Sequence, residues 1–149
     1  AFCARIVVVS GSSMNNTLID GDRLLVQSTF YTPQRGDVVV VDSYINYGKP
    51  LVKRVIAKGG DTVDIDVEQG LVYVNGEALD EPYVPEGTLS TGNVEFPLTV
   101  PEGTLFLMGD NRQHSTDSRS SDVGFIDERD ILGKVVLRIY PFNKIGLIE

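Results

Sequence analysis

The chain has 149 residues, and its contents of 42% hydrophobic and 23% charged residues are typical of one globular domain, 1–149. Thirteen Lys and Arg residues against 21 Asp and Glu residues give a net charge of −8, which argues against nucleic acid or anionic lipid as a partner, because both attract basic surfaces. The single cysteine and single histidine exclude an internal disulfide and argue against a thiolate or histidine-rich metal site.

Short apolar runs rich in β-branched residues recur through the first half of the chain and predict strands. The runs cover residues 6–9, 23–27, 37–41, 51–56, 62–66 and 71–74. The unbroken run at 37–41 predicts a strand that is covered on both faces. After the run at 71–74, Asn75-Gly76 predicts a tight hairpin turn.

The second half begins with residues 79–101, which contain four prolines and predict an extended loop with one short strand at 94–96. Strands are expected at 104–108 and 134–140, and residues 127–130 predict one helical turn capped by Asp127. Many short strands separated by turns predict an all-β fold. Within it, residues 62–103 are interpreted as an inserted β-ribbon and loop lobe.

A polar stretch, residues 10–18, follows the first predicted strand and is suited to displaying a nucleophilic hydroxyl. Gly11 and a serine cluster break the strand, and Asn15 and Asn16 suit a turn. A serine at the end of a rigid strand, on a tight turn with backbone N–H groups nearby, is accessible to a substrate, which makes this serine cluster a candidate source of a nucleophile. The same pattern is also typical of an ordinary boundary between a strand and a turn.

Lys53 lies in the middle of the apolar run at 51–56, where a charged side chain is out of place. Burial disfavours the charged ammonium group and lowers its pKa. A neutral amine can accept the proton of a serine hydroxyl, as in Ser-Lys catalysis. The alternative is a lysine whose stem covers apolar surface while its amine reaches water.

Residues 109–119 form a polar block, Gly-Asp-Asn-Arg-Gln-His-Ser-Thr-Asp-Ser-Arg, directly after the run at 104–108. Its aspartates and arginines are suited to ion pairs that hold the loop rigid. Ser115 or Ser118 is suited to a hydrogen bond with a neutral lysine. The alternative is a solvated, charge-rich loop.

Three blocks in this order resemble the type I signal peptidase family, the Ser-Lys proteases that remove signal peptides from exported proteins. Residues 11–18 are similar to the family's G-x-S-M-x-P-T-L, residues 53–61 resemble K-R-V-x-x-x-x-G-D, and residues 109–119 match G-D-N-R-x-x-S-x-D-S-R. Residues 35–39 match the block that precedes the lysine, and residues 75–83 resemble the intervening segment of the smaller Gram-positive members. The resemblance implies a catalytic core of antiparallel sheets.

By position, the resemblance implies that Ser13 is the nucleophile, that Lys53 is the general base and that Ser115 orients the lysine amine. The backbone N–H of Ser13 would bind the oxyanion. Gly11 stands where some members have a serine that provides a second donor, so no second donor is identified.

The remaining implied site residues support the catalytic groups. Asp117 and Arg119 would form a salt bridge. Asp110, which directly follows Gly109, would pair with Arg54.

Two positions depart from the family pattern. Asn16 and Gly59 stand where the family has prolines. Proline fixes φ and holds a turn more rigidly than asparagine does, so the turn after the nucleophile is expected to be less constrained here.

The resemblance also implies that the substrate binds as an extended strand between residues 7–11 and 51–53, through main-chain hydrogen bonds and shallow pockets. The implied contact residues are Val7, Val9, Gly11, Met14, Leu18, Leu51 and Val52. Three of them, Val9, Met14 and Leu18, would line a pocket for a small residue such as alanine, so cleavage at A-x-A-like sites is expected.

The chain is therefore interpreted as the catalytic portion of a type I signal peptidase without its N-terminal membrane helix. It would act on signal peptides of exported preproteins, on the extracytoplasmic face of the bacterial cytoplasmic membrane. No cofactor or metal is implied, because the lysine amine takes the place of both a metal and a histidine.

Three alternatives stay open at this point. A Ser-Lys autoprotease of the repressor kind shares this core, but the acidic chain and the complete block at 109–119 count against it. A non-enzymatic relative would bind pilin or other secreted proteins as an assembly chaperone; Ser13 and Lys53 count against it, whereas Asn16 favours it. Finally, His114 would serve as the base for Ser13, although it occupies a variable position of the motif.

Overall fold

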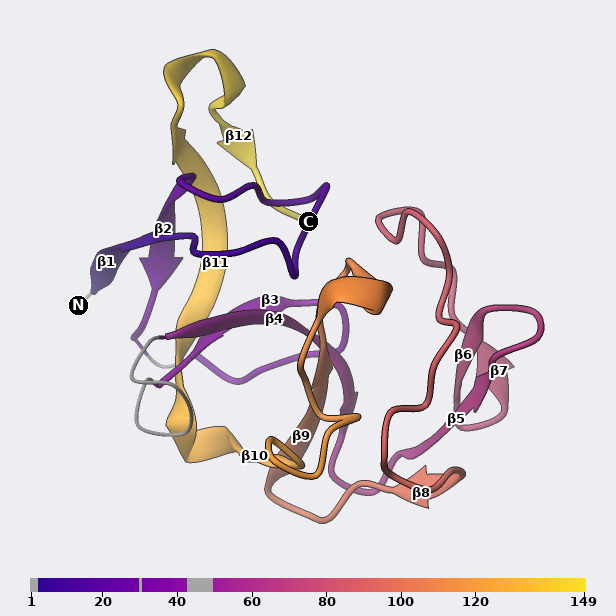
Figure 1. The fold of residues 1–149 in the computed structure, drawn as a ribbon. Helices are drawn as coiled ribbons and strands as arrows, with labels where there is room; N and C mark the ends of the chain where they lie inside the picture. Colours follow the sequence, from indigo (N-terminus) through magenta and orange to yellow (C-terminus); the bar gives the residue numbers. More distant parts are fainter. Residues whose placement is uncertain (1–2, 30, 43–49) are drawn as a thin grey trace.

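The computed structural model describes residues 3–29, 31–42 and 50–149. In this part of the chain the strands form two antiparallel sheets, which confirms the predicted all-β fold (Figure 1). None of the helical segments in the described ranges has the length and apolar character that crossing a bilayer requires.

The larger sheet carries eight of the described strands, in the order β1-β2-β11-β3-β4-β9-β10, with β12 also paired to β11. Their bounds are β1 (Ala4–Val8), β2 (Arg23–Gln27), β3 (Val38–Val41), β4 (Leu51–Lys58), β9 (Thr104–Met108), β10 (Ile126–Asp127), β11 (Ile131–Tyr140) and β12 (Gly146–Leu147). Strand β4 lies between β3 and β9, so it has neighbours on both sides. All four residues of β3 are buried, as its unbroken apolar run predicts.

The smaller sheet has four described strands in the order β7-β6-β5-β8 and lies apart from the larger one in Figure 1. The strands are β5 (Thr62–Asp66), β6 (Leu71–Val74), β7 (Glu77–Ala78) and β8 (Leu98–Thr99). Asn75 and Gly76 form the predicted turn between β6 and β7, with φ of 53° and 83°. Two consecutive residues with positive φ are what a type I′ hairpin turn requires.

Some predicted boundaries are wrong. The short strand expected at 94–96 is absent, and its place is taken by β8, which pairs with Thr62 and Val63. A two-residue strand is determined by this pairing rather than by its own apolar pattern. The last long strand begins at Ile131 instead of residue 134, and β1 covers Ala4–Val8 instead of 6–9.

Three 3-10 segments complete the described elements: η2 (Arg112–His114), η3 (Glu128–Asp130) and η4 (Phe142–Lys144). The turn η3 confirms the prediction at 127–130, because the side chain of Asp127 accepts a hydrogen bond from the backbone N–H of Arg129.

Buried apolar side chains of the described residues form three clusters, and β4 contributes to all of them. Val52 belongs to a cluster beneath residues 9–18, Ile56 to one shared with the smaller sheet, and Val55 to one with β9 and β10. The six interior residues of β4 are therefore buried, including Lys53 and Arg54. The core itself encloses the lysine that the sequence places in an apolar run.

The packing between β11 and β2 gives a first testable prediction. A Cβ atom added to Gly133 would lie 2.2 Å from the carbonyl oxygen of Gln27, whereas one added to Gly146 would meet nothing within 4 Å. We expect Gly133→Ala to lower the free energy of unfolding by about 1–3 kcal/mol or more, and Gly146→Ala to leave it nearly unchanged. Urea unfolding of the two variants measures the difference, and equal midpoints would contradict this packing.

Candidate active site

The stretch from 10 to 18 forms a compact turn after β1, closed at its base by backbone bonds. The N–H of Val9 donates to the carbonyl of Asp22, and the N–H of Gly21 donates back to the carbonyl of Val9, both over 2.8 Å. Gly11 has a φ of 90°, a conformation that favours glycine, and its N–H donates to Asp20 Oδ1 over 2.7 Å. These hydrogen bonds hold the turn in one shape without any contribution from the candidate catalytic side chains.

Two apolar side chains anchor this turn to the core. Met14 is 1% exposed and Leu18 is 0% exposed, and both belong to the cluster beneath the turn. They stand four residues apart, and the N–H of Leu18 donates to the carbonyl of Met14 over 2.9 Å. Ser13, next to the buried Met14, is half-buried at the rim.

Lys53 lies in β4, opposite Val39 of β3, and is 5% exposed. Its Nζ atom donates to Ser115 Oγ over 3.1 Å. The pKa of the Lys53 amine is lowered from 10.5 to about 8, mainly because the amine is buried. The negative charge of Asp117 raises this pKa, and the positive charge of Arg119 lowers it.

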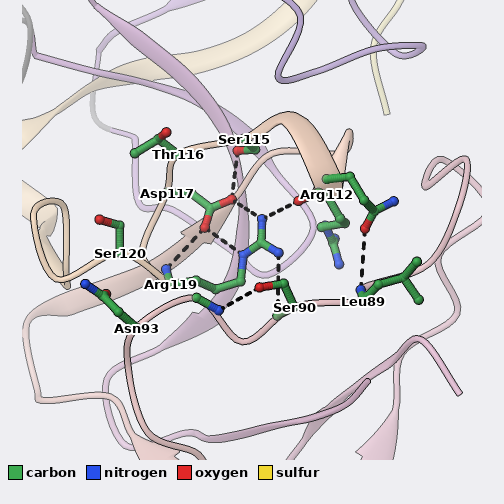
Figure 2. Close-up of a pocket in the computed structure, with 11 residues that line it drawn as sticks. Leu89, Ser90, Asn93, Arg112, Ser115, Thr116, Asp117, Arg119 and Ser120 are labelled. Carbon is green, nitrogen blue, oxygen red and sulfur yellow. Dashed lines mark hydrogen bonds and ion pairs between the residues drawn. The ribbon is translucent and has the colours of Figure 1, made fainter. Parts of the chain in front are cut away.

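Ser115, Asp117 and Arg119 form a chain of hydrogen bonds behind the lysine (Figure 2). The hydroxyl of Ser115 donates to Asp117 Oδ2 over 2.7 Å. The Arg119 guanidinium donates to the same carboxylate through Nε and Nη2, over 2.9 Å each. Burial would raise the pKa of Asp117, but the hydrogen bonds and charge of Arg119, with the bond from Ser115, hold that pKa below its ordinary value.

The direction of these bonds determines what Ser115 does to the lysine. Because the Ser115 proton is donated to Asp117, its oxygen faces Lys53 as an acceptor. A neutral amine that donates one proton to this oxygen has its lone pair directed elsewhere. The chain from Arg119 to Ser115 therefore orients the amine.

Gly109 fills the narrow space between the turn and this chain. Its N–H donates to Ser115 Oγ and to Asp117 Oδ2, both over 3.1 Å. A Cβ atom here would lie 2.3 Å from Ser115 Oγ and 2.5 Å from the carbonyl oxygen of Ser13. Only a glycine lets the two segments approach this closely.

A buried ion pair connects the block at 109–119 to β4. Arg54 donates through Nε and Nη2 to both oxygens of Asp110, over 2.9 and 2.8 Å, and both side chains are at most 1% exposed. Thr17 Oγ1 donates to the same carboxylate over 2.6 Å, and the ring of Tyr83 lies 3.6 Å from the Arg54 guanidinium carbon. The turn at 10–18 is thus tied to the block through Asp110.

A second buried pair connects the block to residues 81–93, which belong to the stretch interpreted as a lobe. Arg112 donates to the Glu81 carboxylate over 2.6 and 3.2 Å, to Thr88 Oγ1 over 2.7 Å, and through Nε to the Gly109 carbonyl over 2.7 Å. Arg119 Nη1 donates to the carbonyl of Ser90 over 3.2 Å. Residues 81–90 therefore support the segment that contacts the lysine.

Ser13 and Lys53 line one small cavity of about 40 Å³. The cavity is lined by Val9, Ser10, Ser13, Met14, Pro50, Leu51, Val52 and Lys53. A cavity of this size holds only a small side chain. A larger hollow of about 450 Å³ opens beside Ser115 and Asp117, facing Ser90 and Asn93 (Figure 2).

The residues expected to contact substrate have different surroundings. Val9, Met14, Leu51 and Val52 line the small cavity. The other three do not: Leu18 lies in the core, Val7 packs against that core, and Gly11 is exposed on the turn.

Sequence reasoning missed the polar partners that lie far along the chain from the block. Thr17, Glu81 and Thr88 each hold a charged residue of the block at 109–119, at separations of 24 to 93 residues. The resemblance of residues 75–83 to a segment of the family indicates that Glu81 matters, but it does not indicate that Arg112 is the partner of Glu81. Thr17 stands at the threonine of the block G-x-S-M-x-P-T-L, which is a signal for the residue but not for its partner Asp110, and Thr88 has no signal beyond residue type.

The surroundings of Lys53 suit proton transfer. A buried amine with a lowered pKa beside a hydroxyl is suited to general base catalysis. In the described part of the chain, no three His, Cys, Asp or Glu side chains gather closely enough to hold a metal ion.

The comparisons with known proteins agree on one family. Residues 1–140 match the model of the family described as signal peptidase, peptidase S26. The chain is 40% identical to signal peptidase I of Bacillus licheniformis, over 97% of this chain and 81% of that protein, and 36% identical to a probable signal peptidase I of Synechocystis, over 97% and 76%. The crystal structure of a signal peptidase I from Enterococcus faecalis is similar with a TM-score of 0.59 and 32% identity, over 71% of this chain and 98% of that one.

The charges around Lys53 give a prediction that two matched aspartates test. Asp117 and Asp127 each bind the arginine two residues later in the same way, but the first pair is buried and the second is exposed. We expect Asp117→Asn to lower the pKa of Lys53 below about 8, because the substitution removes the charge that raises it and leaves Arg119 uncompensated. Asp127→Asn should leave the Lys53 pKa unchanged.

NMR titration of the protein labelled at lysine side chains measures these pKa values. A Lys53 pKa that rises in Asp117→Asn would contradict the electrostatic assignment.

Proposed function

Because the chain belongs to the signal peptidase family, peptidase S26, we propose that it is a serine endopeptidase that removes signal peptides from exported preproteins with a Ser13-Lys53 dyad. The observation that carries the proposal is that Ser13 and the buried Lys53 line the same small cavity. The relatives are signal peptidases by name, which supports signal peptides as the substrate class. The geometry around Ser13 and Lys53 supports nucleophilic catalysis with a lysine base.

The lowered pKa of Lys53 is what makes the amine effective as a base. With a pKa of about 8, roughly a tenth of the molecules carry a neutral amine at pH 7, against about three in ten thousand at the ordinary pKa of 10.5. Burial in β4 thus raises the reactive fraction roughly 300-fold. The hydrogen bond to Ser115 holds Nζ at the cavity that Lys53 shares with Ser13, where the lone pair of the neutral amine would accept the Ser13 proton.

In the first half of the reaction, Ser13 Oγ bonds to the carbonyl carbon of the scissile peptide while its proton passes to the neutral Nζ of Lys53. The substrate's carbonyl oxygen takes the negative charge, and the backbone N–H of Ser13 binds it. The carbon–nitrogen bond then breaks, and the Lys53 ammonium gives its proton to the leaving amine.

The second half uses the same groups. The ester on Ser13 is attacked by a water molecule, whose proton passes to Lys53. The ester bond breaks, and Ser13 recovers its proton from Lys53 as the signal peptide leaves with a free carboxylate. No cofactor enters either half.

The small cavity supports a preference for small residues before the cut. The cavity that Ser13 and Lys53 share with Val9, Met14, Leu51 and Val52 has a volume of only about 40 Å³. A space of this size suits a small side chain such as that of alanine. An extended peptide would reach this cavity along β1 and the start of β4, which supports cleavage at A-x-A-like sites.

We further propose that this catalytic unit acts on the extracytoplasmic face of the bacterial cytoplasmic membrane, where signal peptides of exported proteins become accessible. Its binding partner there is the preprotein itself, bound as an extended strand.

The dyad is tested by cleavage of a signal-peptide substrate with an A-x-A site in detergent. Ser13→Ala and Lys53→Arg should each lower kcat by about a thousandfold or more, because arginine stays protonated in proteins. Ser12→Ala is the matched control, since Ser12 is exposed and its side chain has no assigned role. Cleavage that survives Ser13→Ala but not Ser12→Ala would show that the nucleophile is misassigned, and a wild-type chain that binds the peptide without cutting it would favour the chaperone alternative.

A further inference from the structure

We propose that Asn111 is a positioning residue that fixes the direction of the oxyanion-binding N–H of Ser13. The inference deepens the proposed function and depends on it. It concerns a side chain that the sequence left without a role, inside the block at 109–119.

Asn111 holds two consecutive carbonyl groups of the nucleophile turn. Its Nδ2 atom donates to the carbonyl oxygen of Ser12 over 3.0 Å, and its backbone N–H donates to the carbonyl oxygen of Ser13 over 2.9 Å. These two carbonyls belong to the two peptide units on either side of the Ser13 Cα atom. One residue therefore fixes both peptide planes, and with them φ and ψ of the nucleophile.

The bond from the side chain acts on the oxyanion donor through a single peptide unit. The Ser12–Ser13 peptide is not among the cis bonds of the described chain, so its C=O and N–H point in opposite directions. Fixing the Ser12 oxygen from one side therefore directs the Ser13 N–H to the other. A hydrogen bond to the C=O also polarises the peptide and strengthens the N–H as a donor.

Asn111 is itself held in place by its neighbours. It directly follows Asp110, which is 0% exposed and bound by Arg54 and Thr17. Its own carbonyl accepts a hydrogen bond from the N–H of His114 over 2.9 Å. The Ser12 carbonyl also accepts the N–H of Asn15 over 3.1 Å, a bond within the turn itself. The Asn111 amide is the contact through which the rigid block holds the same oxygen from outside the turn.

The test compares Asn111→Asp and Asn111→Ala with Gln113→Ala in signal-peptide cleavage. Aspartate has nearly the shape of asparagine but no donor, so it removes the bond from the block and leaves the Ser12 carbonyl with only the N–H of Asn15, 3.1 Å away. Gln113 is the matched control because it has an exposed amide in the same segment, which donates to Glu86 over 3.3 Å, away from the turn. We expect kcat to fall about tenfold or more in both Asn111 variants. This loss is smaller than the loss in kcat for removing an oxyanion donor outright, which is about 100- to 1,000-fold.

Three further readouts separate positioning from a general structural role. KM should stay within about threefold of the wild type, because the ground-state peptide does not use the oxyanion donor. In Asn111→Ala, which adds no charge, the pH at which the rate rises should not move, because Lys53 and Ser115 are untouched. A peptide aldehyde, whose carbonyl carbon bonds to Ser13 Oγ and whose oxygen then occupies the oxyanion site, should lose affinity by about the same factor as kcat/KM.

Several results would overturn the inference. They are wild-type kcat in both variants, a loss confined to KM, a displaced pH profile in Asn111→Ala, or aldehyde affinity that stays at the wild-type level. Thermal unfolding is followed for each variant, and if both fail to fold, Asn111 is structural and the inference is wrong. A wild-type chain that does not cleave the substrate overturns the proposed function as well, whereas active wild type with unaffected Asn111 variants overturns the inference alone.

Discussion

Burial of the Lys53 amine in β4 is the constraint on which the rest of the site depends. The strand is covered on both faces, so the amine has Ser115 as a polar partner in place of bulk water. Lowering its pKa from 10.5 to about 8 corresponds to a cost of about 3 kcal/mol for holding the charged form in the fold. That cost is fully present below pH 8, and it falls between pH 8 and 10.5, where the folded state alone has released the proton. The fold thus gives up stability near neutral pH and holds an amine that is partly neutral there.

Buried ion pairs hold the other groups around this amine. Arg54 with Asp110 connects the block at 109–119 to β4, Arg112 with Glu81 connects it to the stretch at 81–93, and Asp117 with Arg119 is an ion pair within the block. Buried pairs contribute little net stability, because desolvation offsets their attraction. Their value here is geometric, since each one fixes a segment that touches the lysine, the nucleophile turn, or both.

The sequence predicts the features that local pattern determines. The strands at 23–27, 62–66, 71–74 and 104–108 are found with those bounds, and Asn75-Gly76 forms the predicted turn. Strand β8 was misplaced because its position depends on pairing with β5. The blocks around Ser13, Lys53 and 109–119 identify the candidate site, but the link from Arg112 to Glu81 joins residues 31 positions apart through polar contacts that leave no periodic pattern. Such contacts can be identified only when the three-dimensional fold is known.

The most direct test of a neutral lysine as the base is the pH dependence of kcat/KM for signal-peptide cleavage, measured in the wild type and in His114→Ala. A lysine that acts when neutral gives a rate that rises with pH, with a midpoint near the Lys53 pKa of about 8. His114 is exposed, so its removal should leave that midpoint in place. A midpoint at about 6.5, the ordinary pKa of histidine, that disappears in His114→Ala would contradict the account.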